Sequence, residues 1–191
     1  MDMNARSLLN TLLVASILSL LIVSPTDVAA QQSSLQLPKT EVRLLGGEDV
    51  NLATQLAGHP TLLVLSFERD QVDDLKSWMA VDRELCTAVP NLRRLSIPVL
   101  PSAARFLRRV IDGGMADTVG TEKGCGRTAT AYIKKEPLLA ALSIKDEQDV
   151  SAILVSAEGT VLWRGKGAAT PAVIAQLREV LENGGGSVAG L

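Results

Sequence analysis

Two cysteines, Cys86 and Cys125, are the residues of this chain best suited to chemistry, because a thiolate is a nucleophile and can form disulfides. Cys125 lies between Gly124 and Gly126 and is predicted to be exposed, whereas Cys86 falls in a helical segment. The spacing does not show whether the two sulfurs come close enough to bond. Three interpretations stay open: a buried Cys86 with a free Cys125, a structural disulfide, and catalysis by either cysteine as a thiol-dependent oxidoreductase or peroxidase.

No other residue pattern indicates a catalytic or metal site. The single histidine, His59, precedes Pro60 and has no acid, thiol or serine partner apparent in the sequence. Zinc centres are built mainly from cysteine and histidine, which are too few here. The chain also lacks a phosphate-binding loop and a Gly-x-Ser-x-Gly elbow. We therefore expect neither a cofactor nor a metal, and an enzyme is the less favoured class.

A group of arginines is the candidate for binding a partner. Three of them recur at helical spacing and so share a helix face, with apolar residues of the same segment predicted on the opposite, buried side. Guanidinium groups suit carboxylates and phosphates, so the group is either a solvated face or a docking surface for an acidic protein or membrane headgroups. The arginines are Arg93, Arg94, Arg105, Arg108 and Arg109, and the apolar residues are Phe106, Leu107, Val110 and Ile111.

The composition indicates one folded domain of near-neutral charge. The chain has 191 residues, 47% of them hydrophobic, and a formal net charge of -2. A near-neutral chain has no overall attraction to nucleic acid or to a membrane surface. An aromatic content of only 3% leaves few rings for base stacking. We therefore expect no nucleic-acid partner.

Residues 1–30 have the pattern of an export signal. Arg6 precedes a mostly apolar run from Leu8 to Val23, and the small residues before Ala30 suit a signal peptidase. The run is interrupted by polar residues and is short against the roughly 20 residues of a membrane span. We predict cleavage after Ala30, a periplasmic or secreted protein and no stable span afterwards; retention as an anchor is the alternative. The predicted parts are a flexible leader at 31–40, a domain at 41–183 and a glycine-rich flexible tail at 184–191.

The domain alternates between strand and helix signals. The clearest strand is Thr61–Phe67, whose nearly continuous apolar run predicts a central strand covered on both faces. A helix over 71–89 follows, with Val72, Leu75, Met79 and Cys86 predicted toward the core. The other predicted elements are an edge strand at 41–45, a short helix or turn at 50–57, strands at 92–99 and 128–133, a helix at 102–111 that ends at Gly113-Gly114, a loop at 115–127 and a helix at 136–142.

The C-terminal part of the domain gives the clearest indication of the fold. Two apolar runs flank a turn in which Gly159 provides the positive φ that a tight hairpin needs. After Gly167, Thr170-Pro171 begins an amphipathic helix as an N-cap and first-turn pair. A buried hairpin that leads into a C-terminal helix is typical of thioredoxin-like domains. We therefore predict an α/β fold, a thioredoxin-like three-layer α/β/α sandwich with a mixed central sheet.

The dithiol of redox-active thioredoxin-like proteins is missing from this sequence. In those proteins Cys-x-x-Cys follows the first central strand, at the start of a helix whose N-terminus lowers the thiol pKa. Here that segment, 67–74, reads Phe-Glu-Arg-Asp-Gln-Val-Asp-Asp. The proline that usually precedes the hairpin strand is also missing, since none lies between Pro137 and Pro171. Ordinary dithiol oxidoreductase activity is therefore not expected.

Several short motifs occur together: the strand at 62–67, Ser77-Trp78, the segment 139–144 and the hairpin segment 162–169. On these motifs the chain resembles the assembly factor family of the mitochondrial ATP synthase, over roughly residues 45–181, as a bacterial, exported relative. The resemblance implies a non-enzymatic binding or assembly role with a protein client, membrane-associated clients included.

Four further residues are predicted to be structural. Trp78 and Trp163 have apolar neighbours and are expected to pack in the domain rather than to stack on a ligand. Gly159 and Gly167 are expected to serve the turns at the two ends of the second hairpin strand.

Overall fold

The computed structural model describes residues 37–89, 91–119, 122–123 and 125–185. The predicted export signal, its cleavage after Ala30 and most of the predicted tail lie outside these ranges. The described residues belong to the unit Gln32–Leu191. Among them, no helix is both long enough and apolar enough to cross a membrane.

The sheet is built from the strands β1 (Glu41–Leu44), β2 (Asp49–Asn51), β3 (Thr61–Ser66), β4 (Arg93–Pro101), β5 (Glu122–Lys123), β6 (Gly126–Ile133), β7 (Ser151–Val155) and β8 (Val161–Lys166). They lie in the order β2-β1-β6-β4-β3-β7-β8, and β5 pairs with the start of β6. β4 is parallel to both β3 and β6, whereas the other pairs are antiparallel. The sheet is therefore mixed, as predicted.

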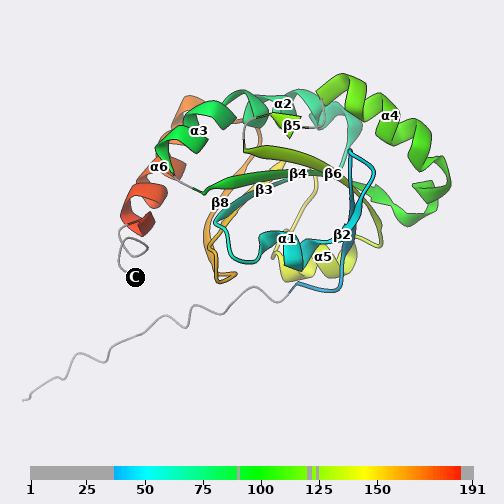
Figure 1. Ribbon diagram of the computed structural model, residues 1–191, viewed down its shortest axis with the longest axis horizontal. Helices are drawn as coiled ribbons and strands as arrows, with labels where there is room; N and C mark the ends of the chain where they lie inside the picture. The colour runs from blue at the N-terminus through cyan, green and yellow to red at the C-terminus, as the bar shows by residue number, and fades with distance from the viewer. Residues whose placement is uncertain (1–36, 90, 120–121, 124, 186–191) are drawn as a thin grey trace, which may run out of the picture. The chain divides into compact units, whose positions relative to one another are not determined.

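The helices are α1 (Leu52–Leu56), the 3-10 helix η1 (Arg69–Gln71), α2 (Val72–Ala80), α3 (Asp82–Ala88), the 3-10 helix η2 (Ser102–Leu107), α4 (Arg108–Val119), α5 (Glu136–Ala141) and α6 (Pro171–Gly185). Figure 1 shows α1 and α5 on one side of the sheet and α2, α3 and α4 on the other. Helix α6 packs into the same apolar cluster as α2 and α3. The predicted three layers are therefore present.

Strand β3 is the reason that helices are needed on both faces. All of its residues are buried. Leu63 and Leu65 belong to the cluster that α1 and α5 complete, whereas Leu62 and Val64 belong to the cluster of α2, α3 and α6. Successive side chains of a strand point to opposite faces, so a strand without a polar face has to be covered twice. The prediction of a central, doubly covered strand here is confirmed.

Ser77 and Trp78 attach α2 to the connection between β8 and α6. The indole Nε1 of Trp78 donates to the Gly167 carbonyl at 2.9 Å, and Ser77 Oγ accepts from the Ala169 N–H at 2.8 Å. Trp78 is fully buried, and its ring meets the ring of Trp163 edge-on at a centroid distance of 6.2 Å. These contacts join α2 to the segment 167–169, which lies about 90 residues further along the chain.

The C-terminal hairpin has the predicted form. β7 and β8 pair antiparallel around Gly159, which has a φ of +86°. Trp163 lies over Gly165, where a Cβ would meet the ring atom Cζ2 at 2.7 Å, so this position of β8 requires glycine. Thr170 Oγ1 accepts from the Val173 N–H at 3.4 Å and caps α6.

One part of the sheet is polar on the side that faces α4. Along β4 and β6, the residues that alternate with the apolar cluster are mostly polar, and Ser96, Thr128 and Thr130 are buried there. Helix α4 meets this part through Asp112, which accepts hydrogen bonds from β6. The polar surface of β6 is therefore matched by a polar residue of the helix.

The apolar residues of η2 and α4 point to solvent, which corrects the prediction that they are buried. The exposed fraction is 82% for Phe106, 76% for Val110 and 46% for Leu107, and Ile111 is half-buried. The less exposed side of α4 combines Ile111 and Met115 with the polar Asp112, and it is Asp112 that bonds to the sheet.

Helix α4 also continues through Gly113-Gly114, which were predicted to end it. Neither glycine has the positive φ with which a C-terminal glycine normally ends a helix. The helix runs to Val119, so the predicted loop at 115–127 begins as helix and contains β5. Likewise α6 extends to Gly185, into the predicted tail.

Two other predicted elements differ in the structure. The strand near residue 41 is not an edge strand, because β2 pairs with β1 on its outer side. The predicted helix over 71–89 is divided into α2 and α3 at Val81. Of the four residues predicted toward the core, only Leu75 is fully buried, and the rest of this surface is formed by Trp78 and Leu85.

The burial of the two tryptophans predicts different costs of truncation. Trp78→Ala should lower the free energy of unfolding by about 3–5 kcal/mol, because a fully buried ring and its hydrogen bond are lost. Trp163→Ala should cost roughly half as much, since this ring is only half-buried. Guanidinium denaturation followed by far-ultraviolet circular dichroism measures both. A cost for Trp163→Ala at or above that for Trp78→Ala would contradict the packing described here.

Candidate functional site

A buried glutamine, Gln71, follows the end of β3. In redox-active thioredoxin-like proteins this region carries the dithiol. Gln71 Oε1 accepts from the Phe67 N–H at 2.8 Å and from the Glu68 N–H at 3.4 Å. Its Nε2 donates to the Glu147 carbonyl at 2.7 Å. The side chain therefore ties the segment after β3 to the segment before β7 and fills the space between them.

The segment that follows β3 has no thiol. Residues 67–74 contain no cysteine, serine or threonine, as the sequence showed. Beside Gln71, Lys135 pairs with Glu147, and their hydrogen bond raises the pKa of the lysine. No group of three or more histidine, cysteine or acidic side chains that could hold a metal ion occurs in the part of the chain that the structure describes. The local arrangement suits structural support rather than catalysis.

Cys86 and Cys125 form a disulfide, with their Cα atoms 6.1 Å apart. The bond joins the end of α3 to the residue that precedes β6. Both residues are half-buried, and neither is a free thiol in this state. Of the three interpretations of these cysteines, the structure shows the disulfide. A catalytic use of either residue stays a prediction.

A cavity of about 390 Å³ opens beside the disulfide, at the edge where β3, β4 and β6 begin. Both cysteines line it, together with His59 and three arginines: Arg93, Arg94 and Arg127. The lining residues within the described ranges include no carboxylate. Gln71 lies at the opposite edge, roughly 20 Å away along the six residues of β3.

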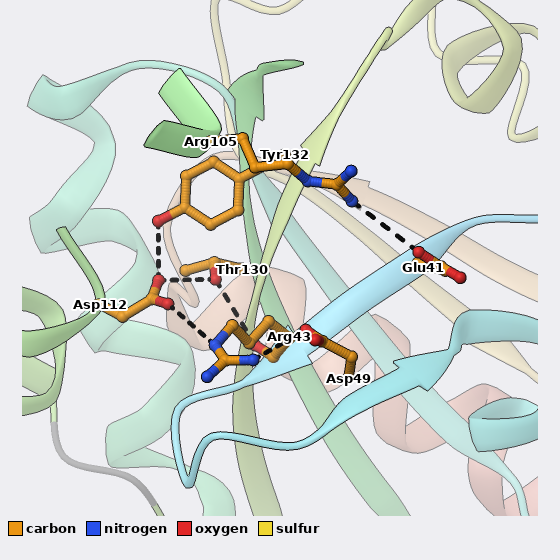
Figure 2. Close-up of polar contacts among 7 residues, drawn as sticks. All are labelled: Glu41, Arg43, Asp49, Arg105, Asp112, Thr130 and Tyr132. Carbon is orange, nitrogen blue, oxygen red and sulfur yellow. Dashed lines mark hydrogen bonds and ion pairs between the residues drawn. The ribbon is translucent and has the colours of Figure 1, made fainter. Parts of the chain in front are cut away.

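A polar network attaches α4 to the sheet (Figure 2). Asp112 Oδ1 accepts from Tyr132 OH at 2.7 Å and from Thr130 Oγ1 at 2.8 Å. Arg43 Nε lies 3.5 Å from Asp112 Oδ2, and Arg43 Nη1 lies 3.0 Å from Asp49. The network thus links α4 to β6, β1 and β2 by polar contacts.

The network has a clear effect on Tyr132. Burial, the hydrogen bond to Asp112 and the negative charge of Asp112 together raise the pKa of the phenol well above its ordinary value. Thr130 and the positive charge of Arg108 act in the opposite direction and do not cancel this effect. Tyr132 therefore stays protonated and keeps donating to Asp112 at every pH near neutrality.

The arginines predicted to bind a partner lie in two places. Arg93 and Arg94 begin β4, whereas Arg105, Arg108 and Arg109 follow its end. The nine residues of β4 separate the two places by roughly 25–30 Å. The structure therefore does not bring the five residues into one patch.

Their environments differ as well. Arg94 is buried and donates to Ser96 Oγ, whereas Arg93 is exposed. Arg105 lies 3.8 Å from Glu41, and Arg108 is half-buried beside Tyr132. Arg109 is exposed, next in sequence to the exposed Val110.

Two functional features were missed in the sequence. Gln71 follows Glu68 by three residues, and this spacing of a capping box was the available signal for its role. The alternation of Thr130 and Tyr132 with the small residues of β6 was the signal for a buried polar face. Nothing in the sequence indicated that Asp112 would meet them.

No protein-family pattern matches this chain, and no curated protein is similar to it in sequence. Solved structures do resemble it. A protein of proposed electron-transfer function from Aquifex aeolicus has a TM-score of 0.59 at 13% identity, over 78% of this chain and 96% of its own. BsSco, of the Sco family of cytochrome c oxidase assembly proteins, has a TM-score of 0.55 at 15% identity, over 77% and 94%. The exposed lipoprotein thioredoxin of Streptococcus pneumoniae has a TM-score of 0.50 at 14% identity, over 73% and 97%.

These similarities show the fold, which is thioredoxin-like, as the sequence predicted. At identities of 13–15% they do not show a shared activity. The resemblance to the ATP synthase assembly factors is not shown by these comparisons.

Replacement of the buried glutamine should destabilise the fold. Gln71→Leu leaves the buried N–H of Phe67 without its acceptor, so we expect a loss of about 1–3 kcal/mol in the free energy of unfolding. Gln176→Leu, on the exposed surface of α6, is the matched control and should change it by less than about 0.5 kcal/mol. Urea denaturation compares the two. Equal stability of the two variants would show that Gln71 does not support this edge.

The titration of Tyr132 can be followed directly because it is the only tyrosine of the chain. The absorbance of phenolate near 295 nm should stay low in the folded protein beyond the ordinary tyrosine pKa of about 10. Above that pH the folded state binds more protons than the unfolded state, so the free energy of unfolding should fall as pH rises.

Removal of the carboxylate tests the cause of this shift. Asp112→Asn should lower the pKa of Tyr132 toward, but not to, its ordinary value, because burial remains. Asp117→Asn, at an exposed position of the same helix, should leave the pKa unchanged. If the folded wild-type protein already formed phenolate at the ordinary tyrosine pKa of about 10, the network described here would be contradicted.

Proposed function

We propose that this chain is an exported thioredoxin-like binding or assembly module, which holds an acidic protein client on the outer face of η2 and α4. The outer face consists of Phe106, Leu107, Val110 and Arg109. The observation that carries the proposal is the exposure of these large apolar side chains on elements that are attached to the sheet through another side, by Asp112.

The chemistry of the outer face defines the client. Exposed apolar groups of this kind mark interaction sites in soluble proteins, because leaving them in water is unfavourable. Arg109, beside Val110, adds a guanidinium group that pairs well with carboxylates. A client segment that combines apolar side chains with neighbouring carboxylates fits both parts of the face.

Three further observations support the binding role. The segment after β3 has no cysteine, and Gln71 is buried there, so dithiol chemistry at that edge is disfavoured. The sequence motifs resemble an assembly factor family, and BsSco is described as belonging to a family of assembly proteins on the same fold. The signal pattern at 1–30 and the described exposure of the pneumococcal lipoprotein thioredoxin favour an exported location.

Site-directed crosslinking tests the proposal. A photoreactive phenylalanine analogue at Phe106 or Val110 should yield an adduct with the same protein in the exporting cell. The same analogue at Glu182, on the exposed side of α6, should yield none of it. Adducts with lipid alone, or identical adducts from position 182, would contradict a protein client on this face.

Charge reversal tests the acidic nature of the client. Arg109→Glu should reduce the adduct at position 106 several-fold at low salt, and less at high salt, because exposed charges are screened. Arg69→Glu reverses an exposed charge outside the outer face and is the matched control. Single surface charges contribute little to stability, so both variants should fold. If the yield of the adduct is unchanged in Arg109→Glu, the client binds through apolar contacts alone and need not be acidic.

A further inference from the structure

The cavity beside the disulfide has a chemical character that the proposed binding role does not use. It is bounded by the starts of β3, β4 and β6, by the end of α3 and by α1. Its volume of about 390 Å³ is in the range of small-molecule sites, roughly 300–1,000 Å³. The outer face lies beyond the other end of β4, so the two places are separate.

The disulfide forms part of the wall of this cavity. Cys86 and Cys125 both line it and are only half-buried, in contrast to the fully buried residues around them such as Leu92 and Leu95. A thiol in the cavity would therefore lie beside both cysteines. Exposed disulfides are among those that are most easily reduced.

The charge of the wall selects among thiols. Arg93, Arg94 and Arg127 line the cavity, and the described lining residues carry no negative charge. Positive groups in a concave surface attract anions and raise their local concentration, which can increase association rates by roughly 10–1,000-fold. Positive charge near a cysteine also stabilises the thiolate that leaves when a disulfide is attacked.

We propose that Cys86–Cys125 is an exchangeable disulfide, and that the arginine-lined cavity beside it binds small thiols that carry carboxylates. This site is independent of the proposed client-binding face and lies at the edge of the sheet opposite to Gln71.

The exchange proceeds in two balanced steps. The thiolate of the small thiol attacks one Sγ of the disulfide, a mixed disulfide forms, and the other cysteine leaves as a thiolate that takes up a proton. A second thiolate attacks the mixed disulfide and releases the second cysteine as a thiol. The protein disulfide gains two electrons, and two molecules of the small thiol are oxidised to one small disulfide.

Three thiols of different charge test the proposal. The folded, oxidised protein is exposed to glutathione, 2-mercaptoethanol or cysteamine at equal thiolate concentration, and the reaction is stopped by alkylation and followed by mass spectrometry. Each rate is divided by the rate of the same thiol with the neutral bis(3-hydroxypropyl) disulfide, which gives a product of distinct mass with each of the three thiols. At low ionic strength the normalised rate for anionic glutathione should exceed that for cationic cysteamine by about tenfold or more. The ratio should approach one at about 0.5 M salt.

Matched variants assign the preference to the cavity. Arg93→Gln with Arg127→Gln should reduce the normalised ratio several-fold, and both residues are exposed enough to replace without loss of fold. Arg69→Gln with Lys134→Gln removes the same charge elsewhere, outside both the cavity and the outer face, and should leave the ratio unchanged.

Three results would overturn the proposal. One is a disulfide that stays intact in the folded protein while the reference disulfide is reduced. Another is a normalised ratio near one in the wild type, which needs no variant and so does not depend on their folding. The third is an equal loss in both double variants, because the preference would then reflect net charge rather than the cavity.

Discussion

The structure depends on the burial of β3 on both faces. A strand with Leu62 and Val64 on one side and Leu63 and Leu65 on the other is stable only between two helical layers. Helices α1 and α5 provide one layer, and α2, α3 and α6 provide the other. The contacts of Trp78 and Ser77 with the residues after β8 hold the second layer in place. These helices use the apolar surface over β3 and β7, and the neighbouring strands on that side are left with a polar surface.

That division explains the unusual attachment of α4. On β6 the sheet presents the hydroxyl groups of Thr130 and Tyr132, and an apolar helix surface there would leave them without the acceptor that Asp112 provides, which costs free energy. Asp112 accepts both hydrogen bonds and also meets Arg43. With Asp112 turned toward the sheet, Phe106 and Val110 are directed outward. The exposure of Phe106 and Val110 is thus a consequence of how the sheet is patterned.

The sequence predicted the structure correctly where the signal lies within one short segment. The run at β3, the glycine turn of the hairpin and the cap of α6 are local signals, and they were sufficient for the fold class. The predicted orientation of this helical segment was wrong, because an amphipathic pattern shows that a helix has two sides and not which side the sheet will accept. The pairing of Cys86 with Cys125 depends on the distance between α3 and β6, which no local pattern contains.

The disulfide also connects the two candidate sites through the chain. The two cysteines are 39 residues apart, and the segment between them contains β4, η2 and α4. In the chain-entropy account, closure of a loop of this length stabilises the folded state by about 4 kcal/mol. The constraint therefore applies to the segment that carries the outer face, although the outer face and the cavity lie at opposite ends of β4. In this account the effect acts on the unfolded ensemble, so it stabilises the whole domain, including α4 and the outer face that it carries.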